Sequence, residues 1–177
     1  MENNAAVTIR PEAPADYPGI RKANKKAFKR KEESKLVDAM RESENFIPAL
    51  SLVAELDGQV VGHILFSAIT IKGPEQETPA LALAPMCVLP EYQGRGIGGA
   101  LLRRGLEACR ELGHKLVVVV GHEDYYPRFG FVQAGEKGLV LPFEAPPGIF
   151  MVLELQPGAL AGVSGEIIYP REFHEVE

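Results

Sequence analysis

Four glycines stand within six residues where a predicted strand gives way to a predicted helix. They are Gly94, Gly96, Gly98 and Gly99, and Arg95 lies between the first two. Glycines leave backbone N–H groups uncovered, and a helix N-terminus adds unpaired donors and a partial positive charge. Because Arg95 adds a full charge beside them, the loop predicts a binding site for a phosphate or pyrophosphate group.

Three interpretations of this loop compete. A glycine-rich turn without a ligand is disfavoured, because glycines at a helix start cost helix stability. A dinucleotide-binding loop is the second, since Gly94, Gly96 and Gly99 match G-x-G-x-x-G and Glu123 follows the next strand. The surrounding elements do not fit a dinucleotide-binding loop, because five residues separate Val88 from Gly94 and an antiparallel hairpin precedes the loop. A Walker A loop is excluded, because no Gly-Lys-Ser/Thr follows.

The third interpretation is a resemblance to the GNAT superfamily of N-acetyltransferases. Gln93, Gly96 and Gly98 match the family's acetyl-coenzyme A pattern, Gln/Arg-x-x-Gly-x-Gly/Ala. A second family motif, an aromatic-Tyr pair shortly before Gly-Phe, is matched by residues 125–131. The version found here is most similar to the small bacterial YhbS-like branch. The order of elements agrees with the family over residues 7–155.

The resemblance implies a fold, an activity and a co-substrate. The fold is a mixed α/β domain with a mostly antiparallel sheet, splayed central strands and flanking helices. The activity is transfer of an acetyl group from acetyl-coenzyme A to a primary amine, by direct attack in a ternary complex. No metal site is expected. The residues expected to bind the co-substrate are Met86, Cys87, Val88, Gln93, Gly94, Arg95, Gly96, Ile97, Gly98 and Gly99.

Acetyl transfer passes through a tetrahedral oxyanion, so the site needs an oxyanion donor and groups that move protons. By the resemblance, the N–H of Val88 is the candidate oxyanion donor, and Tyr126 is the candidate acid that protonates the departing thiolate. Pro85 predicts a bulge or broken pairing inside strand 80–88, which would leave that N–H free. The alternatives are that Pro85 marks a sheet edge and that Tyr126 is a core aromatic.

The sequence names no general base for the amine. The candidates are Glu55, His63, His122 and Glu123, and a chain of water molecules is the alternative. A lone histidine in a strand is usually structural, which disfavours His63 as the base. Cys87 is interpreted as packing rather than as a nucleophile, because no paired His and Asp supports it.

The elements that must position these groups follow from hydrophobic periodicity and turn signals. Asp57-Gly58 predicts a tight hairpin turn. Pro48 is expected to end the segment before that hairpin, and the tail 164–177 shows strand-like residues but no helix signal. The expected strands are 7–10, 50–56, 60–71, 80–88, 116–120 and 150–155, and the expected helices begin near Asp16, Ser34 and Gly98. Residues 7–155 are expected to form one catalytic domain, with 156–177 packed on it.

Composition limits the class of protein. The chain has 177 residues, 46% hydrophobic and 24% charged, which fits one globular domain. Its net charge of -5 argues against nucleic-acid binding. The N-terminus lacks a signal-peptide pattern, no membrane-spanning stretch is present, and two cysteines fit a reducing compartment, so a cytoplasmic location is expected.

A basic run without an acid occupies residues 21–31. It is either a solvated helix face or a wall that faces the acceptor and attracts acidic groups. Its members are Arg21, Lys22, Lys25, Lys26, Lys29, Arg30 and Lys31.

The expected partner is a small-molecule or peptide amine, without nucleic acid or membrane, and a homodimer is left open. Two rival functions remain: a catalytically silent coenzyme A-binding module, and a nicotinamide-dependent oxidoreductase.

Overall fold

A computed structural model describes residues 6–175 of the chain. Within this range the helices are α1 (Tyr17–Phe28), α2 (Glu32–Arg41), α3 (Ile97–Glu111) and α4 (Glu172–Glu175). The strands are β1 (Thr8–Pro11), β2 (Phe46–Leu56), β3 (Gln59–Lys72), β4 (Glu77–Val88), β5 (Leu116–Val120), β6 (Val132–Gln133), β7 (Leu139–Val140), β8 (Phe150–Glu154) and β9 (Gly165–Ile168).

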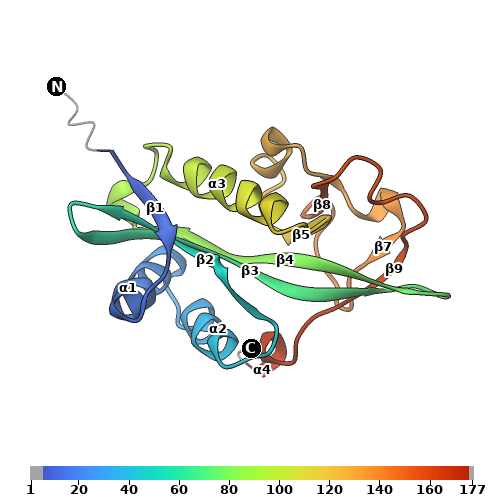
Figure 1. The fold of residues 1–177 in the computed structure, drawn as a ribbon, viewed down its shortest axis with the longest axis horizontal. Helices are drawn as coiled ribbons and strands as arrows, with labels where there is room; N and C mark the ends of the chain where they lie inside the picture. Colours follow the sequence, from blue (N-terminus) through green and yellow to red (C-terminus); the bar gives the residue numbers. More distant parts are fainter. Residues whose placement is uncertain (1–5, 176–177) are drawn as a thin grey trace.

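One mixed sheet forms the middle layer of the molecule. Its main path runs in the order β1-β2-β3-β4-β5-β8-β6, and β9 joins it by pairing with β3 and β7. Neighbouring strands are antiparallel except for the pairs β4–β5 and β7–β9. Helix α3 covers one face, and α1, α2 and α4 lie on the other (Figure 1). The expected α/β fold with a mostly antiparallel sheet is confirmed.

The hairpin of β2 and β3 forms around the predicted turn. Asp57 and Gly58 both have positive φ angles, 51° and 76°. A two-residue turn of this kind matches the twist of the strands that it joins, and Asp-Gly is a preferred sequence for it. The turn fixes the register between the strands, which places Val53 of β2 opposite His63 of β3.

Strands β4 and β5 separate after a short parallel contact. Their paired residues are Leu81 with Val117 and Ala82 with Val118. On the other side of β4 the register against β3 shifts between residues 83 and 86, which places Pro85 in an irregular stretch. The predicted break at Pro85 is confirmed. We call the place where β4 and β5 diverge beyond Ala82 and Val118 the fork.

Side chains alternate across the sheet, so the fork has two differently built faces. Leu83 and Val119 belong to the core beneath α3. Ala82 and Val118 belong to a second core that includes Ile167 of β9. A third core joins α1 and α2 to the sheet.

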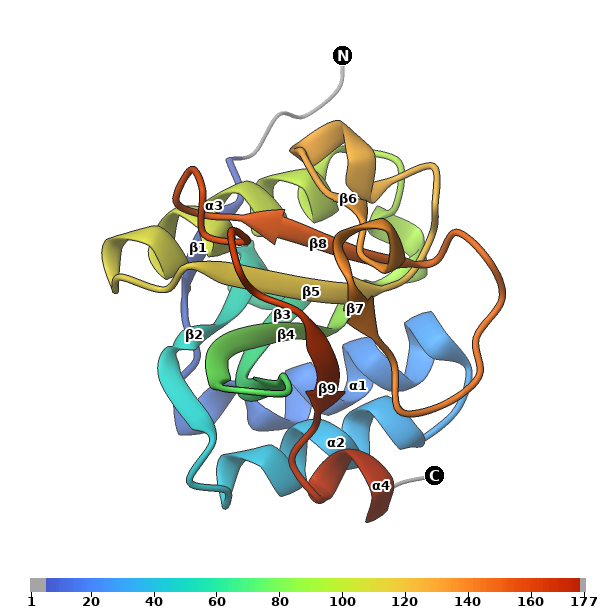
Figure 2. The same cartoon turned by 90° about the vertical axis from the view of Figure 1, so that its right-hand side faces the viewer.

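The C-terminal segment returns to the middle of the sheet. Strand β9 pairs antiparallel with β3 at Thr70–Lys72. Figure 2 shows β9 beside β7 and leading into α4, which lies against α2. Within residues 6–175 no helix is both long and apolar enough to cross a bilayer.

Several sequence-based boundaries were wrong. Strand β2 begins at Phe46 and includes Pro48, because β1 pairs only with residues 52–55 and leaves that end of β2 without a second neighbour. Helix α2 begins at Glu32 rather than at Ser34, which is buried inside it. The tail, expected to lack a helix, contains α4, a single turn too short to show periodicity.

Candidate active site

The glycine loop begins at the end of β4 and leads into α3. Gly94 and Gly96 have φ angles of 77° and 82°, and no atom lies within 4 Å of a Cβ built at either position. Glycine is therefore required there by backbone conformation rather than by crowding. Gly96 is the N-cap residue of α3, and no side chain caps the helix or places an acid in its first turn. The backbone donors at this helix start are left open to a ligand.

Neighbouring side chains fix the loop and add positive charge. Gln93 Nε2 donates to the Val88 carbonyl oxygen at 2.9 Å, which ties the loop to the strand end. Ile97 is buried in the core beneath α3 and anchors the first helical turn. Arg95 lies over the Tyr92 ring at 5.2 Å and is exposed. The Arg103 guanidinium would be 3.4 Å from a Cβ at Gly99, so a second cation lies at the same helix end.

The backbone of Val88 faces the fork. Leu89 N donates to the Val61 carbonyl at 2.8 Å, which makes Leu89 and Val61 a hydrogen-bonded antiparallel pair. Because bonded and non-bonded pairs alternate, the N–H of Val88 points away from β3. It therefore points to the side on which β5 has already diverged. The backbone N–H of Met86, two residues earlier, points to the same side.

Tyr126 lies at the end of β5, inside the core beneath α3. Its side chain packs edge-on against Phe131, with ring centroids 5.5 Å apart. A Cβ at Gly121 would be 2.6 Å from the Tyr126 ring, so the absence of a side chain at Gly121 gives the ring its space. Burial raises the pKa of Tyr126 to about 12, which keeps the hydroxyl protonated near neutral pH.

Tyr125 points to a different part of the site. Its hydroxyl would be 3.3 Å from a Cβ at Gly98, and Val88 Cγ2 would be 3.7 Å from the same point. The two adjacent tyrosines therefore point to different places. Tyr125 reaches the start of α3, and Tyr126 packs at the end of β5. Burial raises the pKa of Tyr125 as well.

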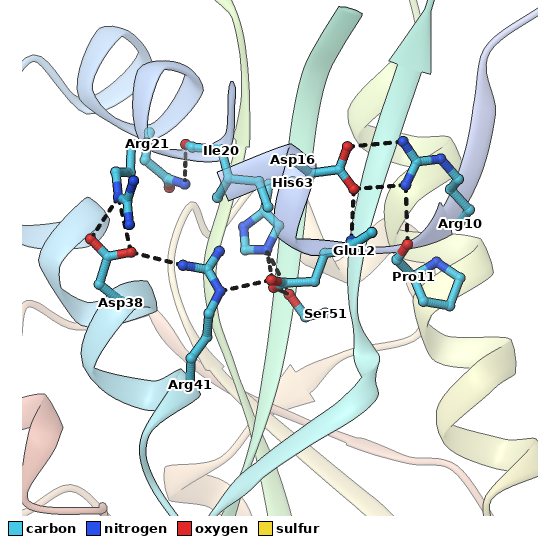
Figure 3. Close-up of polar contacts among 12 residues, drawn as sticks. Arg10, Pro11, Glu12, Asp16, Ile20, Arg21, Asp38, Arg41, Ser51 and His63 are labelled. Carbon is cyan, nitrogen blue, oxygen red and sulfur yellow. Dashed lines mark hydrogen bonds and ion pairs between the residues drawn. The ribbon is translucent and has the colours of Figure 1, made fainter. Parts of the chain in front are cut away.

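His63 lies in a buried polar network on the α1–α2 face (Figure 3). Ser51 Oγ is 2.9 Å from His63 Nε2 and also donates to the Glu12 carboxylate. Because the hydroxyl has one proton, His63 Nε2 must donate to Ser51. Arg41 Nε donates to Glu12 at 2.7 Å. The His63 side chain is fully buried, and burial lowers its pKa. Its hydrogen bond with Ser51 indicates a structural role.

The other base candidates are distributed around the sheet. Glu55 accepts a hydrogen bond of 3.0 Å from Arg10 Nε, so its carboxylate is engaged on the β1 side. His122 and Glu123 are exposed directly after β5. The Glu123 carboxylate lies against Gly148. Burial raises the pKa of Cys87 to about 12, so its thiol stays neutral and suits packing rather than nucleophilic attack.

A cavity of about 170 Å³ opens at the fork. Its walls are residues 82–84 of β4, residues 118–120 of β5, and Phe143, Tyr169, Phe173 and His174. The last four side chains come from the segment after β7, and the sequence analysis missed them. Phe143 lies in a loop, and the strand-like residues of the tail do not indicate where the tail packs. The pairing of β9 with β3 brings the tail to the fork. Arg103 was also missed, although its i, i+4 spacing from Gly99 on a helix could have indicated it.

Comparison with known proteins identifies the family. The model described as Acetyltransferase (GNAT) domain matches residues 8–134. The chain belongs to the GNAT family of acetyltransferases. YjhQ of Escherichia coli, described as an uncharacterized N-acetyltransferase, is 43% identical over 155 residues, which cover 84% of this chain and 85% of YjhQ.

Two solved GNAT structures are similar over nearly the whole chain. The E. coli N-acetyltransferase YhbS in complex with coenzyme A has a TM-score of 0.90 at 32% identity, covering 98% of this chain and 95% of YhbS. A GNAT acetyltransferase of Brucella melitensis in complex with acetyl-coenzyme A has a TM-score of 0.78 at 35% identity, covering 96% and 99%. The expected family and its enzyme class, an acyltransferase, are confirmed. The sheet also lacks the parallel core of a nicotinamide-binding domain within the described residues.

Proposed function

We propose that this protein transfers an acetyl group from acetyl-coenzyme A to a primary amine by direct attack in a ternary complex. One observation carries the proposal: the uncapped N-terminus of α3 and the free N–H of Val88 adjoin the fork between β4 and β5. The first is suited to phosphates and the second to an oxyanion. The coenzyme A complexes of the two similar GNAT structures support this choice of co-substrate.

Residues at the loop would hold the co-substrate from several sides. The N–H groups from Gly94 to Gly99 would bind the pyrophosphate, and Arg95 and Arg103 would add positive charge. Met86, Cys87 and Val88 line the strand end along which the pantetheine arm would extend. Gln93 would maintain the loop through its bond to the Val88 carbonyl. Ile97 anchors the helix start in the core.

In the proposed reaction the amine nitrogen uses its lone pair to form a C–N bond with the thioester carbonyl. The carbonyl oxygen becomes an oxyanion and accepts a hydrogen bond from Val88 N–H. Collapse breaks the C–S bond, and Tyr126 protonates the departing thiolate. The nitrogen releases its proton to water or a nearby base, and the Tyr126 phenolate takes a proton back. The products are an N-acetyl amine and coenzyme A.

Calorimetry and a thiol-release assay would test the proposal. Acetyl-coenzyme A and coenzyme A should bind, and NAD should not. Turnover on an amine separates an acetyltransferase from a silent coenzyme A-binding module, which would bind the co-substrate and release no thiol above the hydrolytic background. Failure to bind acetyl-coenzyme A would overturn the proposed function. The cytoplasmic location and the absence of nucleic acid among the partners stay predictions of the sequence.

A further inference from the structure

The cavity at the fork has an unusual composition for a site that receives an amine. Phe143, Tyr169 and Phe173 form a continuous aromatic wall, with ring centroids 6.1 Å apart for the first pair and 5.1 Å apart for the second. The opposite walls are the small and branched apolar residues of β4 and β5. Of the described residues that line the cavity, none is acidic. His174 and the Tyr169 hydroxyl are the polar groups among them.

We propose that this cavity is the acceptor pocket and that its substrate is a monoamine attached to one aromatic ring or a compact apolar group. The inference rests on the proposed function and names its acceptor class. The volume fits, because a cavity of roughly 150 Å³ accommodates a benzene-sized ring. The aromatic wall supplies stacking and edge-to-face contacts for such a ring.

Charge argues against polycationic acceptors. A diamine, a polyamine or an aminoglycoside would bring additional ammonium groups into the cavity. Without a lining carboxylate, each desolvated ammonium would lack a counter-ion, which is strongly unfavourable. Among the described residues, the cavity lining offers no carboxylate as such a partner.

The same lack of acids helps the chemistry of a monoamine. Desolvation in an apolar cavity lowers the pKa of an amine and favours its neutral form. Only the neutral form carries the lone pair that attacks the thioester. The cavity would therefore supply part of the activation for which the sequence named no base. Burial raises the pKa of Tyr169 to about 12, so its hydroxyl stays a neutral hydrogen-bond donor.

The aromatic wall comes from residues outside the family match at 8–134. Phe143 lies between β7 and β8, lines the cavity and is 47% exposed, so its ring forms part of the cavity wall at the molecular surface. Phe173 of α4 also packs against the core that joins α1 and α2 to the sheet. We accordingly propose that residues 156–175 belong to the same functional domain as residues 7–155.

Kinetics on a panel of acceptors would test the inference. The probes are 2-phenylethylamine, spermidine, an aminoglycoside and a lysine-containing peptide, each with acetyl-coenzyme A at saturation. We expect the highest kcat/KM for 2-phenylethylamine. Phe143→Ala should raise its KM about tenfold with unchanged affinity for acetyl-coenzyme A, because half-exposed ring contacts are lost without disturbing the core. Leu112→Ala is the control: Leu112 is 52% exposed at the end of α3, outside the cavity lining, and its loss should leave KM unchanged.

A second variant tests the charge argument directly. Phe143→Asp provides the missing carboxylate at the cavity opening and should shift preference toward spermidine. A wild-type preference for spermidine or the aminoglycoside, or an unchanged KM in Phe143→Ala, would overturn the inference. Binding of acetyl-coenzyme A without acetylation of any probe amine would also overturn it. Loss of acetyl-coenzyme A binding itself would instead overturn the proposed function on which it rests.

Discussion

Replacing Gly121 by alanine should move the proposed acid without touching it chemically. A Cβ at Gly121 would lie 2.6 Å from Tyr126 Cε2, whereas ordinary contact begins at 3.4 Å. The ring must therefore retreat by about 0.8 Å. The phenol is rigid, so its hydroxyl moves with the ring, and Phe131 and Tyr125, which pack against that ring, must adjust to the shift. Because a misplacement of about 1 Å can cost on the order of 10²-fold in rate, we expect kcat to fall about 10- to 100-fold.

Thiol release at saturating acetyl-coenzyme A measures this effect, and calorimetry should show unchanged co-substrate affinity. Gly135→Ala is the control, because no atom lies within 4 Å of a Cβ at Gly135. Tyr126→Phe should reduce kcat by about 10²-fold, the lower end for a lost general acid. Combined with Tyr126→Phe, the Gly121 change should add little, because both act through one hydroxyl. Full activity of Gly121→Ala, or multiplying effects in the double variant, would refute the reasoning.

Three further outcomes are expected. Gly96→Asp places a carboxylate at the start of α3, the proposed phosphate site, and should weaken coenzyme A binding by tenfold or more in calorimetry. Gly96→Asn is the control, because Asn also tolerates the positive φ, and it should weaken binding less. Arg103→Ala should also weaken coenzyme A binding, with a smaller effect at high salt. If the basic run faces an acidic acceptor, Lys25→Glu with Lys26→Glu should raise the acceptor KM more than it lowers kcat; salt-independent kinetics would indicate a solvated face.

The sequence suggested a basic run without acidic neighbours, and the structure agrees only for its lysines. Arg21 pairs with Asp38 at 3.0 Å and Arg30 pairs with Glu33 at 2.7 Å, so acids from α2 neutralise both arginines. Asp38 comes close to Arg21 because α2 packs against α1, whereas Glu33 is only three residues after Arg30. The lysines of the run are exposed, and none has an ion pair within residues 6–175.

Local signals in the sequence predicted most of the fold and the glycine loop that is the candidate co-substrate site. The glycine loop, the Asp57-Gly58 turn and the period of α3 are each encoded within a few residues. Pro85 indicated the broken pairing because proline cannot donate to a ladder. In contrast, strands β6 and β7 have two residues each, which is too short for a pattern.

The proposed acceptor pocket could not be predicted in the same way. Phe143, Tyr169 and Phe173 meet only because β9 pairs with β3, about 100 residues earlier in the chain. Each aromatic residue stands in a segment with no periodic neighbours, so nothing local distinguishes it from an ordinary packing residue. Long-range pairing decides their position, and one sequence does not reveal it.

The buried network around Glu12 makes the protein sensitive to acid. Burial lowers the pKa of His63. When the pH falls below the usual histidine pKa, His63 therefore binds a proton in the unfolded chain but not in the folded chain. Burial opposes ionisation of Glu12, but hydrogen bonds with His63, Arg41 and Ser51 outweigh it and lower the pKa of that carboxyl. Both groups therefore make folding less favourable as the pH falls, His63 first and Glu12 at lower pH.

The network fastens the segment before α1 and the end of α2 to β2 and β3, beside the core on which Phe173 packs. Acid would thus weaken the packing of α1 and α2 on this face of the sheet, where Phe173 also packs. The lowest pH at which the protein stays folded is therefore set in part by groups that take no part in the proposed chemistry.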